Sequence, residues 1–333
     1  MKAPRHAPIL VTGGAGFIGS HLVERLLAEG HDVVVLDDLS TGRLKNLKNV
    51  RSHPRLRLVI SKVSECAELV KLAETSQYIF HLAAVVGVDL VMRSPLRAIQ
   101  TNLRETEAIL EAATRRRTPL LLTSTSEVYG KSRKKTFAEE DDLLIGPPCY
   151  TRWSYACSKL MDEFLALAYA RERRLPVVIT RLFNTVGPRQ TGRFGMVLPR
   201  FLAAAESGQP LRVFGDGHQT RCFCHVQDVV EALVRLHRTR TARGEVFNIG
   251  GTEEISIRSL AERVIRLTGS RSQMEFVPYE EACAVGFEDM RRRRPRVDKL
   301  ARAIGFRPAR TLDQIIRECL PAKKNTKILV ASL

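Results

Sequence analysis

The chain has 333 residues, of which 44% are hydrophobic and 27% charged, and a formal net charge of +17 at pH 7. This length and composition allow a full core, in one large or two closely joined domains, and no run approaches the roughly 20 apolar residues that cross a bilayer. The charge is typical of a nucleic-acid partner or of an arginine-rich surface around an anionic substrate. Because no nucleic-acid-binding motif accompanies it, we expect the second.

The first residues of the chain and its cysteines indicate the cellular compartment of the protein. The segment MKAPRHAPILVTGG lacks the long apolar stretch of a secretory signal. Seven cysteines at irregular spacing do not form a disulfide framework. The pair Cys222 and Cys224 lacks matching His or Cys ligands, so no metal site is expected. We expect a soluble, cytoplasmic protein.

Strand-like apolar runs alternate with helix-length amphipathic segments through the first half of the chain. Strands are predicted at 9–12, 32–36, 56–60, 78–81, 120–123 and 177–180, and helices at 17–28, 95–115 and 154–174. Parallel strands need crossover connections, which these helices provide. The pattern therefore predicts an α/β fold of the Rossmann type, a doubly wound parallel sheet covered on both faces.

After Arg181 the alternation becomes irregular, with frequent Gly and Pro. Helices are still predicted at 196–207, 226–238, 256–267 and 312–320. We interpret residues 1–180 as a cofactor domain and 181–322 as a smaller, interleaved α/β substrate domain. Segments near 211–250 are expected to contribute to both, and 323–333 to form a tail.

A glycine-rich loop lies between the first strand and the first helix. Gly13, Gly16 and Gly19 allow a tight turn and bring the helix N-terminus toward a pyrophosphate. An acidic residue, Asp37, follows about 20 residues later at the end of the second strand, as in dinucleotide sites. Its carboxylate suits ribose hydroxyls and repels a 2′-phosphate, which favours NAD over NADP. Two alternatives stay open: Asp37 as a simple turn cap, and Arg43 as a phosphate ligand.

Tyr155 and Lys159 form a Y-x-x-x-K pair at the start of a helix, so both side chains lie on one face. A phenol, with a pKa of about 10, is a poor base at neutral pH, and a neighbouring ammonium lowers that value. Tyr155 could then remove a proton from a sugar hydroxyl. Such a pair alone is often a chance surface feature. However, the strand at 120–123 continues into Ser124-Thr125-Ser126-Glu127, at the sheet edge where ligands bind in such folds.

Together these motifs resemble the extended short-chain dehydrogenase/reductases, the nucleotide-sugar epimerases, dehydratases and decarboxylases. The likeness runs from about residue 9 to 318 and includes TGGAGFIG, HLAA, RLFNTVGPR, GDGHQTR and FNIG. It implies Thr125, Tyr155 and Lys159 as the catalytic triad. The cofactor contacts implied are Gly13, Gly16, Phe17, Ile18, Gly19, Asp37, Ser40, Gly42, Val63, Leu82, Ala83, Ala84, Asn102, Tyr155 and Lys159. The substrate contacts implied are Asn184, Arg193, Val197, Arg221 and Arg293, with Asn184 and Arg221 on the diphosphate. The stretch Ser61-Lys62-Val63 departs from the family in lacking an acidic residue near the adenine.

Two segments separate the branches of this family. Ser126-Glu127 after Thr125 is similar to the corresponding residues of the UDP-glucuronate decarboxylases and the UDP-apiose/xylose synthases. At this place 4-epimerases usually have small residues and 4,6-dehydratases have Asp-Glu. The segment GFEDMRRRRP resembles the decarboxylase segment with a carboxylate-binding arginine, which Arg293 matches. The arginine run could instead be a solvated basic loop. Ser126 stands where the apiose-forming enzymes have Cys, which argues against ring contraction.

The resemblance implies oxidation of UDP-glucuronate at carbon 4 with NAD, followed by decarboxylation to a UDP-4-keto-pentose or UDP-xylose. Ser126, Glu127 and Arg293 then join the catalytic residues, with Arg293 positioning the carboxylate. A 4-epimerase of a UDP-sugar is the close alternative, and a non-catalytic NAD-binding regulator the distant one. The helices predicted at 95–115 and 154–174 could pair between two copies, so we expect a homodimer.

Overall fold

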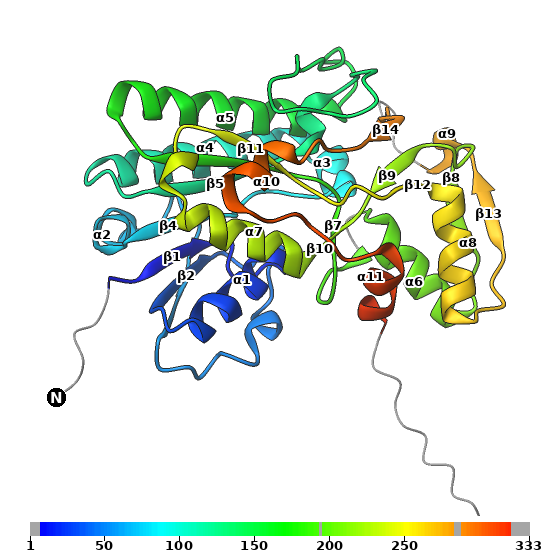
Figure 1. Cartoon of the computed structure of the whole chain (residues 1–333), viewed down its shortest axis with the longest axis horizontal. Coiled ribbons are helices and arrows are strands. Elements are labelled where there is room, and N and C mark those ends of the chain that lie inside the picture. The colour runs from blue at the N-terminus through cyan, green and yellow to red at the C-terminus, as the bar shows by residue number, and fades with distance from the viewer. Residues whose placement is uncertain (1–6, 193–194, 283–287, 321–333) are drawn as a thin grey trace, which may run out of the picture.

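A parallel sheet forms the centre of the molecule (Figure 1). The computed structural model describes residues 7–192, 195–282 and 288–320; Arg193 and the expected tail lie outside them. Seven strands follow the order β11-β6-β5-β4-β1-β2-β3, and every neighbouring pair is parallel. The strands are β1 Ile9–Thr12, β2 Val33–Asp37, β3 Leu56–Ile60, β4 Tyr78–His81, β5 Leu120–Thr125, β6 Val177–Leu182 and β11 Val246–Ile249. The predicted doubly wound fold is confirmed.

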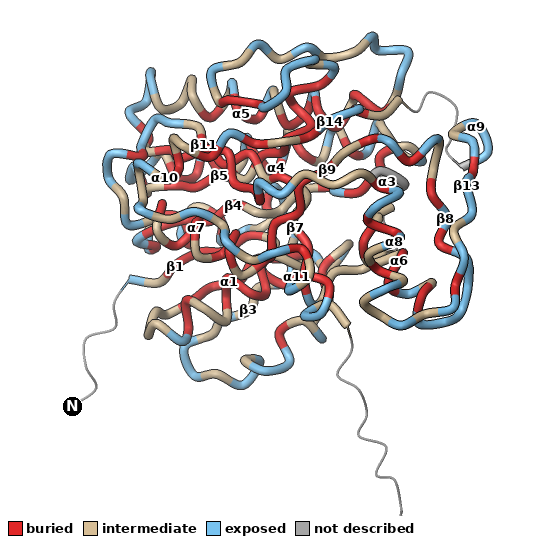
Figure 2. Tube along the Cα trace, turned by 45° about the vertical axis from the view of Figure 1, so that its right-hand side comes forward, coloured by how far each residue is buried: buried red, intermediate tan, exposed pale blue. Residues whose placement is uncertain are grey.

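Both faces of the sheet are apolar, and helices cover each of them. Alternate residues of a strand point to opposite faces, so Ile9 and Val11 pack on one side and Leu10 on the other. Helices α1 Phe17–Ala28 and α7 Val226–Arg238 cover the first side. Helices α2 Leu69–Thr75, α4 Pro95–Thr114 and α5 Trp153–Arg173 cover the second (Figure 1). Figure 2 shows buried residues along the central strands and on the inner sides of these helices.

The predicted elements agree with the structure to within a few residues, with two informative differences. Strands β5 and β6 each run two residues further than expected, to Thr125 and Leu182. Hydroxyl-bearing residues end β5, and their polarity hides the end of the strand from an apolar pattern. The short helix α3 Val88–Arg93 and the 3-10 turn η2 Ser126–Tyr129 carry no clear periodicity and were not expected.

A smaller unit lies beyond the carboxyl ends of the large sheet. Its core joins α6 Val197–Ser207, α8 Ile257–Thr268 and α11 Leu312–Cys319. Its strands are the pair β8 Leu211–Phe214 and β13 Met274–Val277, the sheet β12 Glu254–Ser256, β9 Thr220–Cys222 and β14 Arg292–Arg293, and the pair β7 Thr185–Val186 and β10 Cys224–His225. Helix α9 Tyr279–Ala282 follows β13, and α10 Asp298–Ile304 returns to pack on β11 and α7.

The chain crosses between the two units more than once. β11 and α7 belong to the large sheet and its cover, although both come after residue 181. The division into residues 1–180 and 181–322 therefore stays our proposal, with α7 and β11 as the interleaved part. No helix within the described ranges is long and apolar enough to cross a membrane.

Candidate active site

Two neighbouring cavities lie at the carboxyl edge of the large sheet. The larger has a volume of about 340 Å³ and lies between the sheet and the smaller unit. Its walls include Phe17, Ile18, Ala84, Thr125, Glu127, Tyr155, Lys159, Asn184, Val197, Arg221 and Arg293. The smaller, of about 80 Å³, is lined by residues that include Gly13, Gly16, Asp37, Ser40, Val63, Leu82, Ala83 and Ala84. Segments from both halves of the chain thus meet at one place.

The glycine loop has the shape that a dinucleotide requires. Gly13 has a φ of +70°, which favours glycine. A Cβ on Gly19 would come within 2.1 Å of the Gly13 carbonyl oxygen, so a larger residue there would displace the turn. The Gly16 N–H donates to the Gly13 carbonyl at 3.1 Å, and α1 begins at the next residue. Phe17 and Ile18 of this first turn line the larger cavity and Gly13 and Gly16 the smaller, which puts the N-terminus of α1 where a pyrophosphate would be bound.

Asp37 lies at the end of β2 beside the smaller cavity. Its Oδ2 accepts the Ala15 N–H and its Oδ1 accepts the Leu39 N–H, each at 2.8 Å. Burial raises the pKa of this carboxyl, and the two N–H donors oppose that rise. A Cβ on Gly42 would lie 2.8 Å from Oδ1, so glycine leaves the carboxylate room. Asp37 therefore joins the glycine loop to β2 and also faces the space where a ribose would lie.

Asn102 lies outside the described lining of the two cavities, as do Gly19 and Gly42. It is buried on α4, and its Oδ1 accepts the Val85 N–H at 2.8 Å. Its Nδ2 donates to the Ser158 hydroxyl at 3.0 Å, which ties α4 to the helix that carries Tyr155. Asn102 thereby supports the segment that follows β4.

Tyr155 and Lys159 lie one turn apart at the start of α5, and both are buried. Burial raises the pKa of Tyr155, and the carboxylates of Glu127 and Asp162 raise it further, while Arg152 and Arg293 oppose them. The sequence predicts a phenol made more acidic by Lys159. In the structure the Lys159 Nζ lies 2.8 Å from Asp162 Oδ2, and this carboxylate offsets the ammonium charge.

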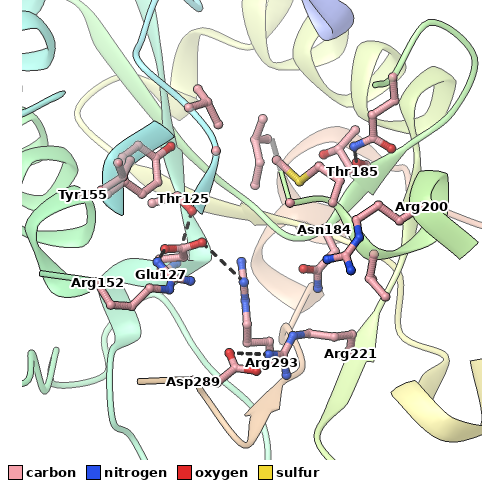
Figure 3. Close-up of a pocket in the computed structure, with 18 of the residues that line it drawn as sticks. Thr125, Glu127, Arg152, Tyr155, Asn184, Thr185, Arg200, Arg221, Asp289 and Arg293 are labelled. Carbon is pink, nitrogen blue, oxygen red and sulfur yellow. Dashed lines mark hydrogen bonds and ion pairs between the residues drawn. The ribbon is translucent and has the colours of Figure 1, made fainter. Parts of the chain in front are cut away.

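Thr125 and Glu127 approach Tyr155 from the end of β5 (Figure 3). The Thr125 Oγ1 accepts the Glu127 N–H at 3.2 Å and caps the turn η2. This turn directs the Glu127 carboxylate into the cavity. The hydroxyls of Thr125 and Tyr155 and the carboxylate of Glu127 thus lie on the same part of the cavity wall.

Glu127 lies between two buried arginines (Figure 3). It is ion-paired with Arg152, and its Oε1 is 3.5 Å from Arg293 Nη1. Burial raises the pKa of Glu127, but the two guanidinium groups outweigh it and hold the value below its usual range. Arg293 also donates to the Ser126 hydroxyl at 2.7 Å. The cavity therefore holds a fixed carboxylate with two cations around it.

Arg293 differs from the arginines beside it. It is 9% exposed and lines the cavity, whereas the side chain of Arg291 is 86% exposed. Strand β14 pairs with β9 so that Arg293 lies opposite Arg221. Burial, followed by the nearby Arg221 and Arg152, lowers the pKa of Arg293 to about 10, although Glu127 opposes the change. A site this rich in positive charge suits an anion.

The remaining expected substrate residues lie on the smaller unit. The Asn184 Nδ2 donates to the Cys222 carbonyl at 3.0 Å, and Val197 begins α6. Arg221 Nη2 lies 2.7 Å from Asp289 Oδ1. Among the other residues that line the cavity are three charged ones that the sequence did not single out: Arg152, Asp289 and Arg200. Arg152 could have been found, because it precedes Tyr155 by three residues and so lies on the same side of the helix start.

Comparisons with known proteins agree with this geometry. The sequence model of the NAD dependent epimerase/dehydratase family matches residues 9–250. A UDP-N-acetyl-alpha-D-glucosaminuronate decarboxylase of Bacillus cytotoxicus is 41% identical over 313 residues, covering 93% of this chain and 96% of that protein. UDP-glucuronic acid decarboxylase 1 of Danio rerio is 34% identical over 311 residues, covering 92% of this chain and 70% of that protein. A crystal structure of a mutant UDP-glucuronic acid 4-epimerase from Bacillus cereus, in complex with UDP-4-deoxy-4-fluoro-glucuronic acid and NAD, has a TM-score of 0.83 at 28% identity, covering 93% of this chain and 97% of that chain.

Proposed function

The chain belongs to the NAD dependent epimerase/dehydratase family, and from that premise we propose that it is an NAD-dependent decarboxylase of UDP-glucuronate. One observation carries the choice of reaction: Arg293 is buried in the cavity wall beside Glu127, facing the region where Tyr155 and Thr125 meet. A guanidinium in such a place suits a carboxylate, because its planar donors match the two oxygens. Relatives named as decarboxylases of UDP-linked uronic acids support it.

The cofactor that we propose is NAD, held by the glycine loop and the smaller cavity. The turn from Gly13 to Gly19 would bind the pyrophosphate, and Asp37 the adenosine ribose. A 2′-phosphate would meet the Asp37 carboxylate with like charge, which favours NAD over NADP. When bound, NAD supplies the acceptor for hydride from carbon 4.

The residues of the larger cavity perform the remaining chemistry. Tyr155 takes the proton of the 4-hydroxyl as the sugar is oxidised. A ketone at carbon 4 is placed β to the carboxylate, so carbon dioxide can leave as an enolate forms. The hydroxyls of Thr125 and Tyr155 stabilise that oxyanion by hydrogen bonding. Arg293 binds the carboxylate before it leaves, and Glu127, held ionised by its two arginines, orients it.

The sugar itself has two candidates. The Bacillus cytotoxicus relative is named for the 2-acetamido sugar and the Danio rerio relative for glucuronate. Both substrates carry the carboxylate at the same carbon, so the site of Arg293 and Glu127 serves either. The 4-epimerase alternative shares the first oxidation, and its support is the similar fold of the Bacillus cereus enzyme.

Product analysis separates these reactions. The protein is incubated with NAD and either UDP-glucuronate or its 2-acetamido analogue, and the products are followed by NMR and by release of carbon dioxide. We expect carbon dioxide and a UDP-pentose or its 4-keto form. Interconversion of glucuronate and galacturonate nucleotides without carbon dioxide would show an epimerase instead. If neither sugar reacts, the proposed substrate class is wrong.

We also propose that the protein is a cytoplasmic homodimer. Helices α4 and α5 pack side by side on the large sheet and carry exposed apolar residues. Leu96 is 67% exposed, Phe164 64% and Met161 54%. On α5, Met161 and Phe164 continue the spacing of the exposed Cys157, which makes an apolar stripe. A second copy would bury this stripe in a four-helix contact. The cytoplasmic location rests on the number and spacing of the cysteines.

A further inference from the structure

The Lys159 side chain is paired with a carboxylate that the Y-x-x-x-K pattern does not contain. Asp162 follows Lys159 by three residues on α5, so both point to the same side of the helix. The distance from Lys159 Nζ to Asp162 Oδ2 is 2.8 Å, and the two side chains are 3% and 0% exposed. At this depth water does not screen the pair, so each charge depends on the other.

The next residue on the helix gives a natural comparison. Glu163 is also buried, but its carboxylate turns to Arg181, at 2.8 Å, and to the Ser124 hydroxyl, at 2.5 Å. Two adjacent buried carboxylates on α5 therefore have separate cationic partners. Only the Asp162 pair includes a residue of the proposed catalytic triad.

Other charged and titratable groups surround the Lys159–Asp162 pair. From β4, His81 faces Lys159, and burial and the ammonium lower the pKa of His81 to about 3, so it is neutral in the working range. From α4, the Thr106 hydroxyl lies near both His81 and Asp162. Tyr155 is on the same helix, with Arg152 just before it, while Glu127 on η2 and Arg293 on β14 act on Tyr155 from across the cavity. Burial raises the pKa of Asp162, Lys159 followed by Thr106 opposes that rise, and the neighbouring carboxylate of Glu163 adds to it.

We propose that Asp162 is a positioning residue for the reaction: its carboxylate holds the Lys159 ammonium and sets how much of that positive charge acts on Tyr155. An ammonium has three N–H donors, so one bond to Asp162 leaves two for the cofactor ribose and the Tyr155 side of the cavity. Asp162 also raises the pKa of Tyr155 directly. The proposal rests on the function proposed above, because it assigns Tyr155 and Lys159 their roles.

Removing the charge of Asp162 should move the pH dependence of the enzyme toward acid. In Asp162→Asn, the ammonium acts on Tyr155 without compensation, so the phenol ionises at lower pH and the acid limb of kcat/KM moves down. The ammonium, buried without a counter-charge, also loses its proton more readily, so the alkaline limb moves down as well. We expect each limb to move by about one pH unit or more.

Titration of NAD by calorimetry between pH 6 and pH 10 tests the same idea without any sugar. The wild type should bind NAD with nearly constant affinity across this range. In Asp162→Asn the affinity should fall about tenfold toward pH 10. A shift of one pH unit in the protonation of the binding site changes the ratio of its two protonation states tenfold. Because this measurement needs no turnover, it tests Asp162 even if the assigned substrate is wrong.

Glu163→Gln is the matched control. It removes a neighbouring buried carboxylate of the same helix, whose cationic partner is Arg181, and should lower the melting temperature while both pH limbs move much less than in Asp162→Asn. If Asp162→Asn does not fold, Asp162→Ser makes room for a water beside the ammonium and should show the same displacement. The proposal is overturned if the Asp162 variants retain the wild-type pH limbs and the wild-type pH dependence of NAD binding. Equal displacement in Glu163→Gln would also overturn it.

Discussion

Two buried carboxylates are paired with three of the cations near Tyr155. Glu127 faces Arg152 and Arg293, and Asp162 faces Lys159. Tyr155 lies between these groups, and the carboxylates raise its pKa while the two arginines oppose them. A uronic acid entering the cavity adds a further carboxylate, which has to share Arg293 with Glu127. The strength of Tyr155 as a base thus depends on how these charges are distributed when substrate is bound.

Tyr155→Phe tests whether the Tyr155 hydroxyl is the base that takes the 4-hydroxyl proton. The change removes only the hydroxyl that moves the proton, so turnover should fall by about 10²–10⁴-fold. NAD binding by calorimetry should remain close to that of the wild type, because the ring still packs against Val85, Val91 and Ala98. Full activity in this variant would contradict the dehydrogenase chemistry, including its epimerase form.

Arg293→Ala tests the choice of reaction. Loss of a charge-assisted pair with the substrate carboxylate, worth about 1.5–3 kcal/mol, should weaken UDP-glucuronate binding by about 10–100-fold and nearly stop release of carbon dioxide. Arg293→Lys should restore little, because lysine lacks the planar, bidentate geometry. Binding of neutral UDP-glucose should change much less.

The neighbouring Arg291→Ala is the control for Arg293, because its side chain is exposed and the charge removed is the same. It should leave both binding and carbon dioxide release unchanged. If Arg293→Ala behaves like Arg291→Ala in every assay, Arg293 has no part in the reaction and the carboxylate site is misplaced.

At the scale of the element, the turn from β1 to α1 has no room for one added methyl group at Gly19. In Gly19→Ala the new Cβ would lie 2.1 Å from the Gly13 carbonyl oxygen, so the turn must open. We expect NAD affinity to fall at least tenfold, an estimate from the loss of one or more N–H contacts to the pyrophosphate, as measured by calorimetry.

Gly208→Ala gives the comparison for Gly19. Gly208 ends α6 with a φ of +67°, and a Cβ there meets nothing within 4 Å. The substitution should cost about 1 kcal/mol of stability, because alanine disfavours this conformation, and should leave NAD affinity unchanged. An equal loss of NAD binding in both variants would mean that the effect of Gly19→Ala is a general loss of folding.

Local sequence patterns predicted the helices and strands well, because these elements depend largely on residues that are neighbours in the chain. The spacing of Gly13, Gly16 and Gly19 and the pair Tyr155 and Lys159 are of this kind, and so are the strands and helices of the large sheet. Asp162 belongs here too: its i,i+3 spacing from Lys159 was readable, but a carboxylate on a helix is usually solvated. Nothing local shows that this one is buried.

Contacts between distant parts of the chain could not be read in the same way. Arg293 meets Ser126 and Glu127 across more than 160 residues, and it is placed there by the pairing of β14 with β9 and by the backbone bonds of its neighbours Arg294 and Arg296 to Phe137. The resemblance pointed to Arg293, but the residue pattern alone suited a solvated loop equally well. Asp289 was not singled out for a related reason: folding brings it to its partner Arg221, whereas Arg152 had a local signal in its spacing from Tyr155.

At the scale of the whole molecule, the cavity exists only because the two units meet. The large sheet contributes Thr125, Glu127 and Tyr155, and the smaller unit contributes Arg221 and Arg293. The chain passes back to the large sheet through α7 and β11 before it forms β14. Arg293 on β14 therefore approaches Glu127 from the smaller unit, where β14 is paired with β9.

The outer side of α4 and α5 carries the last prediction, on assembly. Phe164→Glu places a charge in the middle of the exposed apolar stripe, where a second copy would have to bury it without a partner. We expect the wild type to sediment as a dimer at micromolar concentration and Phe164→Glu as a monomer. Phe276→Glu is the control, because Phe276 is 47% exposed on β13, in the smaller unit away from α5. That variant should remain dimeric. A monomeric wild type, or a dimer that survives Phe164→Glu, would show that this stripe is not the contact between copies.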